Sequence, residues 1–64
     1  MSAYSLRMHY RTTGLAPVVE PLEVSDETEA RELARVRLLL TRDYSRVELH
    51  RGGEPLEAFA RDEA

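Results

Sequence analysis

The stretch "RVELHRGGEPLEAF", residues 46–59, contains two alternating runs joined by Gly52 and Gly53. Alternation with a period of two is typical of strands with one buried face. Two adjacent glycines supply the positive φ angles that a tight hairpin turn needs. This stretch therefore predicts a β-hairpin, with one strand over residues 44–51 and a returning strand over about 55–60.

The alternation also predicts which side chains face the core. In the first strand Val47 and Leu49 share one parity, and in the returning strand we expect Leu56 and Ala58 to point inward. The opposite parity is expected to face solvent, and comprises Tyr44, Arg46, Glu48, His50, Glu57 and Phe59.

The segment before the hairpin predicts a helix. Ser25 or Asp26 can cap its start, Asp26 and Glu29 have capping-box spacing, and the helix should run to about Leu40 or Thr41. At 100° per residue, one broad apolar face collects Ala30, Leu33, Ala34, Val36 and Leu40.

Two residues depart from this helical pattern. Arg37 falls inside the apolar arc, where its stem could pass the edge of the core. Leu39 falls on the polar side, either as a single exposed leucine or, next to Arg35, as part of a contact patch.

The N-terminal third predicts two more strands. Residues 4–11 alternate without a break, with Tyr4, Leu6, Met8 and Tyr10 on one parity. Residues 18–24 form a weaker run containing Pro21, which cannot donate to a ladder, and this run is expected at a sheet edge or bulge. The helix crossing would let the third strand return beside the first.

Strand, strand, helix, strand, strand is an α+β plan (ββαββ), in which one helix covers one face of an antiparallel sheet. A chain of 64 residues makes one domain, 1–64, with residues 61–64 expected to form a frayed tail. There is no cysteine, hence no disulfide or thiolate site.

The composition favours a cytoplasmic protein. We see neither the apolar run of a signal peptide in the first residues nor a stretch of about 20 apolar residues that would span a membrane. The net charge of −3 is too small to identify a partner. All nine basic residues are arginine, a bias more typical of a GC-rich genome than of selection for guanidinium chemistry.

The uncovered face of the sheet is the first candidate binding surface. It should carry Arg7 and His9 with the outward residues of the hairpin. Arginine and aromatic side chains are enriched at protein interfaces, which predicts a protein-binding module whose partner is another protein or a second copy in a homodimer. Solvated strand residues with cross-strand ion pairs, or a platform for single-stranded nucleic acid, are the alternatives. The proposed contact residues are Arg7, His9, Tyr44, Arg46, His50 and Phe59.

The acidic residues around the start of the helix form the second candidate surface. Small phage-encoded inhibitors, including anti-CRISPR proteins, are similar in size and sign of charge, which suggests an inhibitor of a nucleic-acid-binding complex. Ordinary helix N-terminal electrostatics would also explain the acids. The residues concerned are Glu20, Glu23, Asp26, Glu27 and Glu29.

Enzymatic activity is not expected, and neither is a cofactor or metal. Only His9 and His50 would titrate near neutrality without a large shift, and two histidines make an incomplete metal site. No serine or threonine lies in a nucleophile-elbow setting. Gly52-Gly53 is not a phosphate loop, because no helix with a lysine follows it.

Residues 24–60, "VSDETEARELARVRLLL" followed by "YSRVELHRGGEPLEAF", resemble small bacterial and phage proteins of unknown function. In those proteins an acidic helix start and an E-A-x-x-x-A run precede a strand, a glycine turn and a short last strand. The resemblance implies the ββαββ plan and carries over no functional residue.

Overall fold

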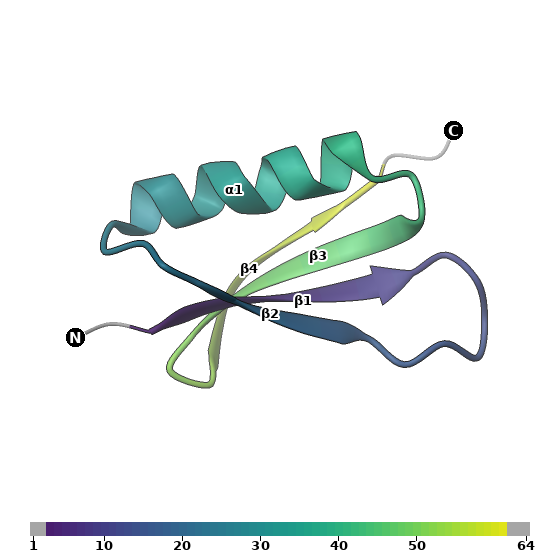
Figure 1. Cartoon of the computed structure of the whole chain (residues 1–64), viewed down its shortest axis with the longest axis horizontal. Helices are drawn as coiled ribbons and strands as arrows, with labels where there is room; N and C mark the ends of the chain where they lie inside the picture. Colours follow the sequence, from purple (N-terminus) through teal and green to yellow (C-terminus); the bar gives the residue numbers. More distant parts are fainter. Residues whose placement is uncertain (1–2, 62–64) are drawn as a thin grey trace.

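A computed structural model describes residues 3–61 as a four-stranded antiparallel sheet with one helix packed on one face (Figure 1). The elements are β1 (Tyr4–Tyr10), β2 (Val18–Leu22), α1 (Glu27–Leu40), β3 (Tyr44–Arg51) and β4 (Glu54–Ala60). The predicted ββαββ plan is therefore confirmed. Within these residues, no helix combines the length and apolar content that a membrane crossing requires.

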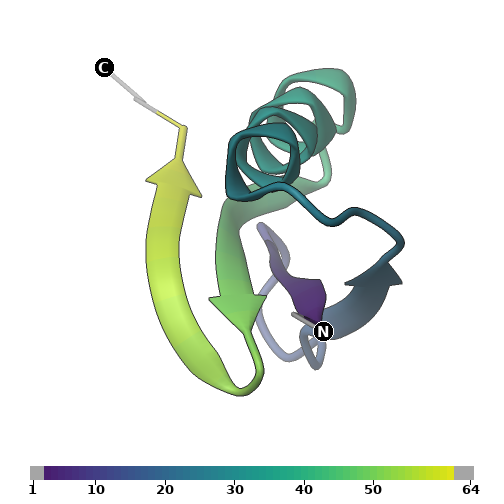
Figure 2. The ribbon, with the colours of Figure 1, turned by 90° about the vertical axis from the view of Figure 1, so that its left-hand side faces the viewer.

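The strands are arranged in the order β2-β1-β3-β4, and every neighbouring pair is antiparallel. β3 returns beside β1, as expected, and β2 lies at one edge with Pro21 in it. β4 forms the other edge, where Figure 2 shows it outermost, beyond the part of the sheet beneath α1. The β3–β4 hairpin turns at Gly52 and Gly53, whose φ angles of 56° and 90° favour glycine.

The core lies between α1 and the central strands. Alternate residues of β1 and β3 point toward the helix, as their sequence pattern predicted. The buried side chains are Tyr4, Leu6, Met8, Ala30, Ala34, Leu38, Val47 and Leu49.

The buried face of α1 differs from the predicted face. Ala30 and Ala34 are buried as expected, but the third buried residue is Leu38, whereas Leu40 is 78% exposed. Leu33 and Val36 are also exposed. Two small alanines let the helix backbone approach the sheet, so the centre of contact follows them rather than the largest aliphatic residues.

Arg37 and Arg31 flank this buried face. Arg37 forms an ion pair with Glu20 of β2, and Arg31 lies 3.8 Å from Glu57 of β4. Arg37 can fall inside the apolar arc because its side chain reaches past the edge of the core to the carboxylate of Glu20.

A β-bulge corrects the predicted position of Tyr44. His9 lies opposite Arg46, but Tyr10 lies opposite Tyr44, which leaves Ser45 as an extra residue in β3. Because of this extra residue, the part of β3 before Ser45 faces the opposite side of the sheet from the one that strict alternation predicts. Tyr44 therefore packs against the core and not on the open face, with its ring centroid 5.2 Å from that of Tyr10.

A second irregularity corrects the predicted faces of β4. Leu49 lies opposite Glu57 and His50 lies opposite Pro55, which leaves Leu56 as the extra residue. Leu56 packs against the core as expected. Beyond it, however, Glu57 and Phe59 lie on the helix side, whereas Ala58 faces away from it; these three expectations were wrong.

Arg61 is held against the end of the helix, although the sequence predicted a frayed tail from this residue onward. Its Nε donates to the carbonyl of Tyr44 at 3.0 Å, and its Nη2 donates to the carbonyls of Leu38 and Thr41. Carbonyls in the last turn of a helix have no intrahelical partner, and the guanidinium supplies one. The rest of the expected tail, 62–64, lies outside the described residues.

Candidate functional site

The open face of the sheet carries a polar cluster centred on Glu48, which we call the Glu48 cluster. Glu48 Oε1 lies 3.1 Å from Nε2 of His50 and 3.4 Å from Nε2 of His9. Its Oε2 lies 2.8 Å from a guanidinium nitrogen of Arg46. Arg7 lies opposite Glu48 in the ladder between β1 and β3.

The neighbours of Glu48 stabilise its charged form. Its side chain is only 16% exposed, and this burial alone would raise its pKa. The hydrogen bond to His50, helped by His9 and the charge of Arg46, outweighs the burial and holds the pKa of Glu48 below its usual value. The carboxylate is therefore ionised near neutral pH and offsets the positive charge around it.

The Glu48 cluster brings together four of the six contact residues that the sequence predicted: Arg7, His9, Arg46 and His50. The cluster also brings the two histidines near each other, since both contact one oxygen of Glu48. Among residues 3–61, however, no group of three or more His, Cys, Asp or Glu side chains is arranged to hold a metal ion. A depression of about 230 Å³ adjoins the cluster, lined by Ser5, Arg7, Val19, His50 and Gly53.

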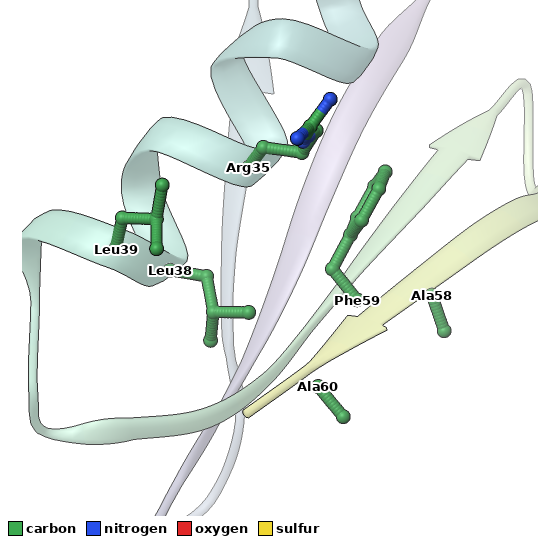
Figure 3. A pocket seen from close by; sticks show the side chains of 6 residues that line it. All are labelled: Arg35, Leu38, Leu39, Ala58, Phe59 and Ala60. Atoms are coloured by element: carbon green, nitrogen blue, oxygen red, sulfur yellow. The ribbon is translucent and has the colours of Figure 1, made fainter. Parts of the chain in front are cut away.

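The other two predicted contact residues lie on the helix side of the sheet. Tyr44 is partly buried against Tyr10, and burial with this neighbour raises the pKa of its phenol. Phe59 points from β4 toward α1, whereas Ala58 and Ala60 point to the other side of the strand (Figure 3). The alternation of the sequence could not separate these two aromatic residues from the open face, because a bulge lies between each of them and the regular part of its strand: Tyr44 precedes Ser45, and Phe59 follows Leu56.

A groove of about 370 Å³ runs between the second half of α1 and β4, and we call it the α1–β4 groove. Leu39 is 70% exposed in it and Leu38 is buried at its base. Arg35 provides its charged group. The residues that line it are Arg35, Leu38, Leu39, Ala58, Phe59 and Ala60 (Figure 3).

The α1–β4 groove was only partly foreseen. The sequence offered Leu39 and Arg35 as members of a contact patch, because a leucine interrupts the polar side of the helix. It did not connect them with Phe59, since Phe59 was expected on the opposite face of the sheet. Only the pairing of Phe59 with Val47 brings these residues together.

Most of the acidic residues near the helix start have partners within the chain. Asp26 Oδ1 accepts a hydrogen bond from the backbone N–H of Thr28 at 3.1 Å and caps α1. Glu20 pairs with Arg37, and Glu27 lies 3.1 Å from Arg31. Glu23 and Glu29, the other two residues of the predicted acidic surface, are exposed.

Comparison with known proteins adds no functional assignment. The resemblance to small bacterial and phage proteins stays a prediction. Neither a protein-family model, nor a curated protein, nor a solved structure matches this chain.

Proposed function

We propose that this protein is a non-enzymatic protein-binding module and that the α1–β4 groove is its binding surface. The observation that carries the proposal is that Leu39 exposes 70% of its surface beside Leu38 and the half-buried Phe59. Single exposed leucines are ordinary, but continuous apolar surface at a concave site is typical of interfaces.

The lining of the groove supports a protein partner. Aromatic residues and arginine are enriched at protein interfaces, and the groove offers Phe59 and Arg35 next to aliphatic surface. The free edge of β4 forms one wall of the same groove. A partner could therefore combine backbone hydrogen bonds to the strand with side chains placed against Leu39 and Phe59.

The other two candidate surfaces receive less support. In the Glu48 cluster the carboxylate already pairs with Arg46, His9 and His50, which reduces the charge available for phosphates of a single-stranded nucleic acid. Asp26 caps α1 and Glu27 pairs with Arg31. These local roles are the simpler explanation of the acidic surface. Both alternatives remain outcomes of the experiment below.

The test is affinity capture from a lysate of the source organism, with and without nuclease, using the wild-type protein, Leu39→Ser and Leu40→Ser. Both leucines are highly exposed in the last turn of α1, but only Leu39 lines the groove. We expect a nuclease-resistant protein that is lost with Leu39→Ser and retained with Leu40→Ser.

Three results would contradict the groove as the binding surface. Equal capture by both leucine variants would remove Leu39 from the interface. Loss of partners on nuclease treatment, or with Arg7→Ala and Arg46→Ala, would favour nucleic acid on the open face. Loss with Glu23→Ala and Glu29→Ala alone would favour the acidic surface.

A further inference from the structure

We infer that the partner at the β4 edge is a second copy of this chain, paired antiparallel through β4 with Phe59 on the twofold axis. This inference rests on the proposed function, because it identifies the protein that meets the α1–β4 groove. It adds the geometry of the complex, including which residues of the two β4 strands lie opposite each other.

The edge of β4 has backbone groups directed away from the sheet. The backbone N–H of Arg61 donates to the carbonyl of Ser45 at 3.2 Å, so the backbone of Arg61 faces β3. Backbone groups of successive strand residues alternate in direction. Those of Ala58 and Ala60 therefore point toward the free edge, where a second strand can accept and donate hydrogen bonds.

The bulge limits which part of β4 can pair regularly. Leu56 is the extra residue, and the regular segment begins at Glu57 and continues to Arg61, which still bonds to β3. Phe59 is the middle of this segment. A twofold axis at Phe59 places Ala58 opposite Ala60 of the second copy, with the two hydrogen-bonded pairs that the free edge requires.

Charge favours this register over an axis at Glu57, and the bulge at Leu56 disfavours an axis at Ala58. With the axis at Phe59, Glu57 of each copy lies opposite Arg61 of the other, and symmetry provides this pair twice. An axis at Glu57 would place two carboxylates opposite each other, which is unfavourable. An axis at Ala58 would place Glu57 opposite Phe59 and would use Leu56 in the irregular part of the strand.

The two side chains of each proposed ion pair lie on the same side of β4 as α1. Glu57 is 42% exposed and lies on the helix side of β4. The guanidinium of Arg61 is fixed there by the carbonyls of Leu38, Tyr44 and Thr41, through Nε and Nη2. Its Nη1 is not used in these bonds and can donate to Glu57 of the second copy.

The same register joins the two α1–β4 grooves. Residues opposite each other across an antiparallel ladder share a face, so both helices lie on one side of the eight-stranded sheet. Each helix lies mainly over β3, and three strand spacings of about 4.8 Å separate β3 from its counterpart by about 14 Å. Helices in direct contact are only about 8–10 Å apart, so the two Phe59 rings would meet between the helices.

The first experiment is sedimentation equilibrium of the wild-type chain, Ala58→Pro and Ala58→Ser. The wild type should approach twice the 7.3 kDa mass of one chain. Proline removes an N–H that points to the free edge and breaks no β3–β4 bond, so Ala58→Pro should be monomeric with an unchanged circular dichroism spectrum. Ala58→Ser keeps the N–H and should dimerise as the wild type does.

The second experiment measures the register and does not depend on the folding of the proline variant. The chain has no cysteine, so Ala58→Cys and Ala60→Cys each introduce one thiol on exposed, small positions. Opposed residues in a hydrogen-bonded pair have Cα atoms about 5.5 Å apart, which suits a disulfide. Under mild oxidation a mixture of the two variants should form a mixed disulfide dimer at least tenfold faster than either variant alone forms its own.

The possible results separate this inference from the proposed function. A wild-type chain that stays at 7.3 kDa overturns the second copy as the partner, whereas capture of another protein that depends on Leu39 would leave the groove proposal intact. Fast crosslinking of Ala58→Cys with itself would move the axis to Ala58 and overturn the register. A dimer that forms the mixed disulfide, and that Leu39→Ser weakens while Leu40→Ser does not, supports both proposals, with the second copy as the partner.

Discussion

Phe59 lies directly opposite Val47 across the β3–β4 ladder, which places the only phenylalanine of the chain on the helix side of the sheet. Val47 is fully buried and Phe59 packs against the same core. The ring therefore has two roles. It extends the core beyond β3, and it lines the α1–β4 groove on which the proposed function depends.

Replacement of this ring should cost stability. We expect Phe59→Ala to lower the free energy of unfolding by about 2 kcal/mol, less than for a fully buried phenylalanine because the ring is only half-buried. The control Ala58→Ser, on the exposed side of the same strand, should stay within about 0.5 kcal/mol. Urea denaturation at one fixed protein concentration measures both, since self-association would add to apparent stability. A loss as small as that of the control would place the ring outside the core.

The orientation of α1 can be tested with two leucines of its last turn. Leu38 is 6% exposed and Leu40 is 78% exposed. Leu38→Ala should lower the free energy of unfolding by about 2–4 kcal/mol, whereas Leu40→Ala should change it by less than about 0.5 kcal/mol. Thermal or urea unfolding distinguishes them. The reverse order would mean that α1 buries the face that the sequence predicted.

Arg61 should stabilise the fold although it follows the last strand. Arg61→Gln removes charged hydrogen bonds to the carbonyls of Leu38, Thr41 and Tyr44. Hydrogen bonds to charged groups contribute more than neutral ones, and we expect a loss of about 1.5–3 kcal/mol. Arg42→Gln makes the same chemical change at an exposed position and is the control. Equal melting temperatures for the two variants would refute the role of Arg61.

The Glu48 cluster should make stability depend on pH in the acid range. The folded protein holds the pKa of Glu48 below its ordinary value of 4.5, chiefly through the hydrogen bond to His50. Because the pKa of Glu48 is lower in the folded protein than in the unfolded chain, the unfolded chain takes up the proton at a higher pH as the pH falls. The stabilisation by ionised Glu48 is therefore present above about pH 4.5 and is lost as the pH falls through the folded pKa.

Glu48→Gln isolates this contribution. The difference in unfolding free energy between the wild type and Glu48→Gln should be largest near neutral pH and should shrink steadily below pH 4.5. Urea titrations at several pH values between neutrality and the acid range measure it. A difference that does not change with pH would show that the charge of Glu48 does not contribute to folding.

Local sequence signals determined much of this architecture. Period-two alternation located β1 and β3, the two glycines located the hairpin turn, and Asp26 marked the start of α1. Pro21 correctly indicated an edge strand. These features follow from backbone geometry within a few residues, which is why the sequence alone predicts them.

The candidate site was predicted only in part. Arg7, His9, Arg46 and His50 gather on the open face because no bulge interrupts β1 and β3 between them. Glu48 was expected there as a partner of arginines, but its role as the centre of the cluster depends on the pairing of β1 with β3. The α1–β4 groove could not be assembled, since it joins a helix and a strand whose facing residues were assigned incorrectly.

The sequence by itself determined the number, type and approximate limits of the secondary structure elements, because hydrophobic period, capping and turn chemistry act locally. The tertiary structure decided which side chains face the helix. Ser45 and Leu56 are extra residues only with respect to the strands paired with them, and Ala30 and Ala34 define the buried face of α1 only where the sheet approaches it. A one-residue change in register moves every later side chain to the other face, and register is a property of two strands rather than one.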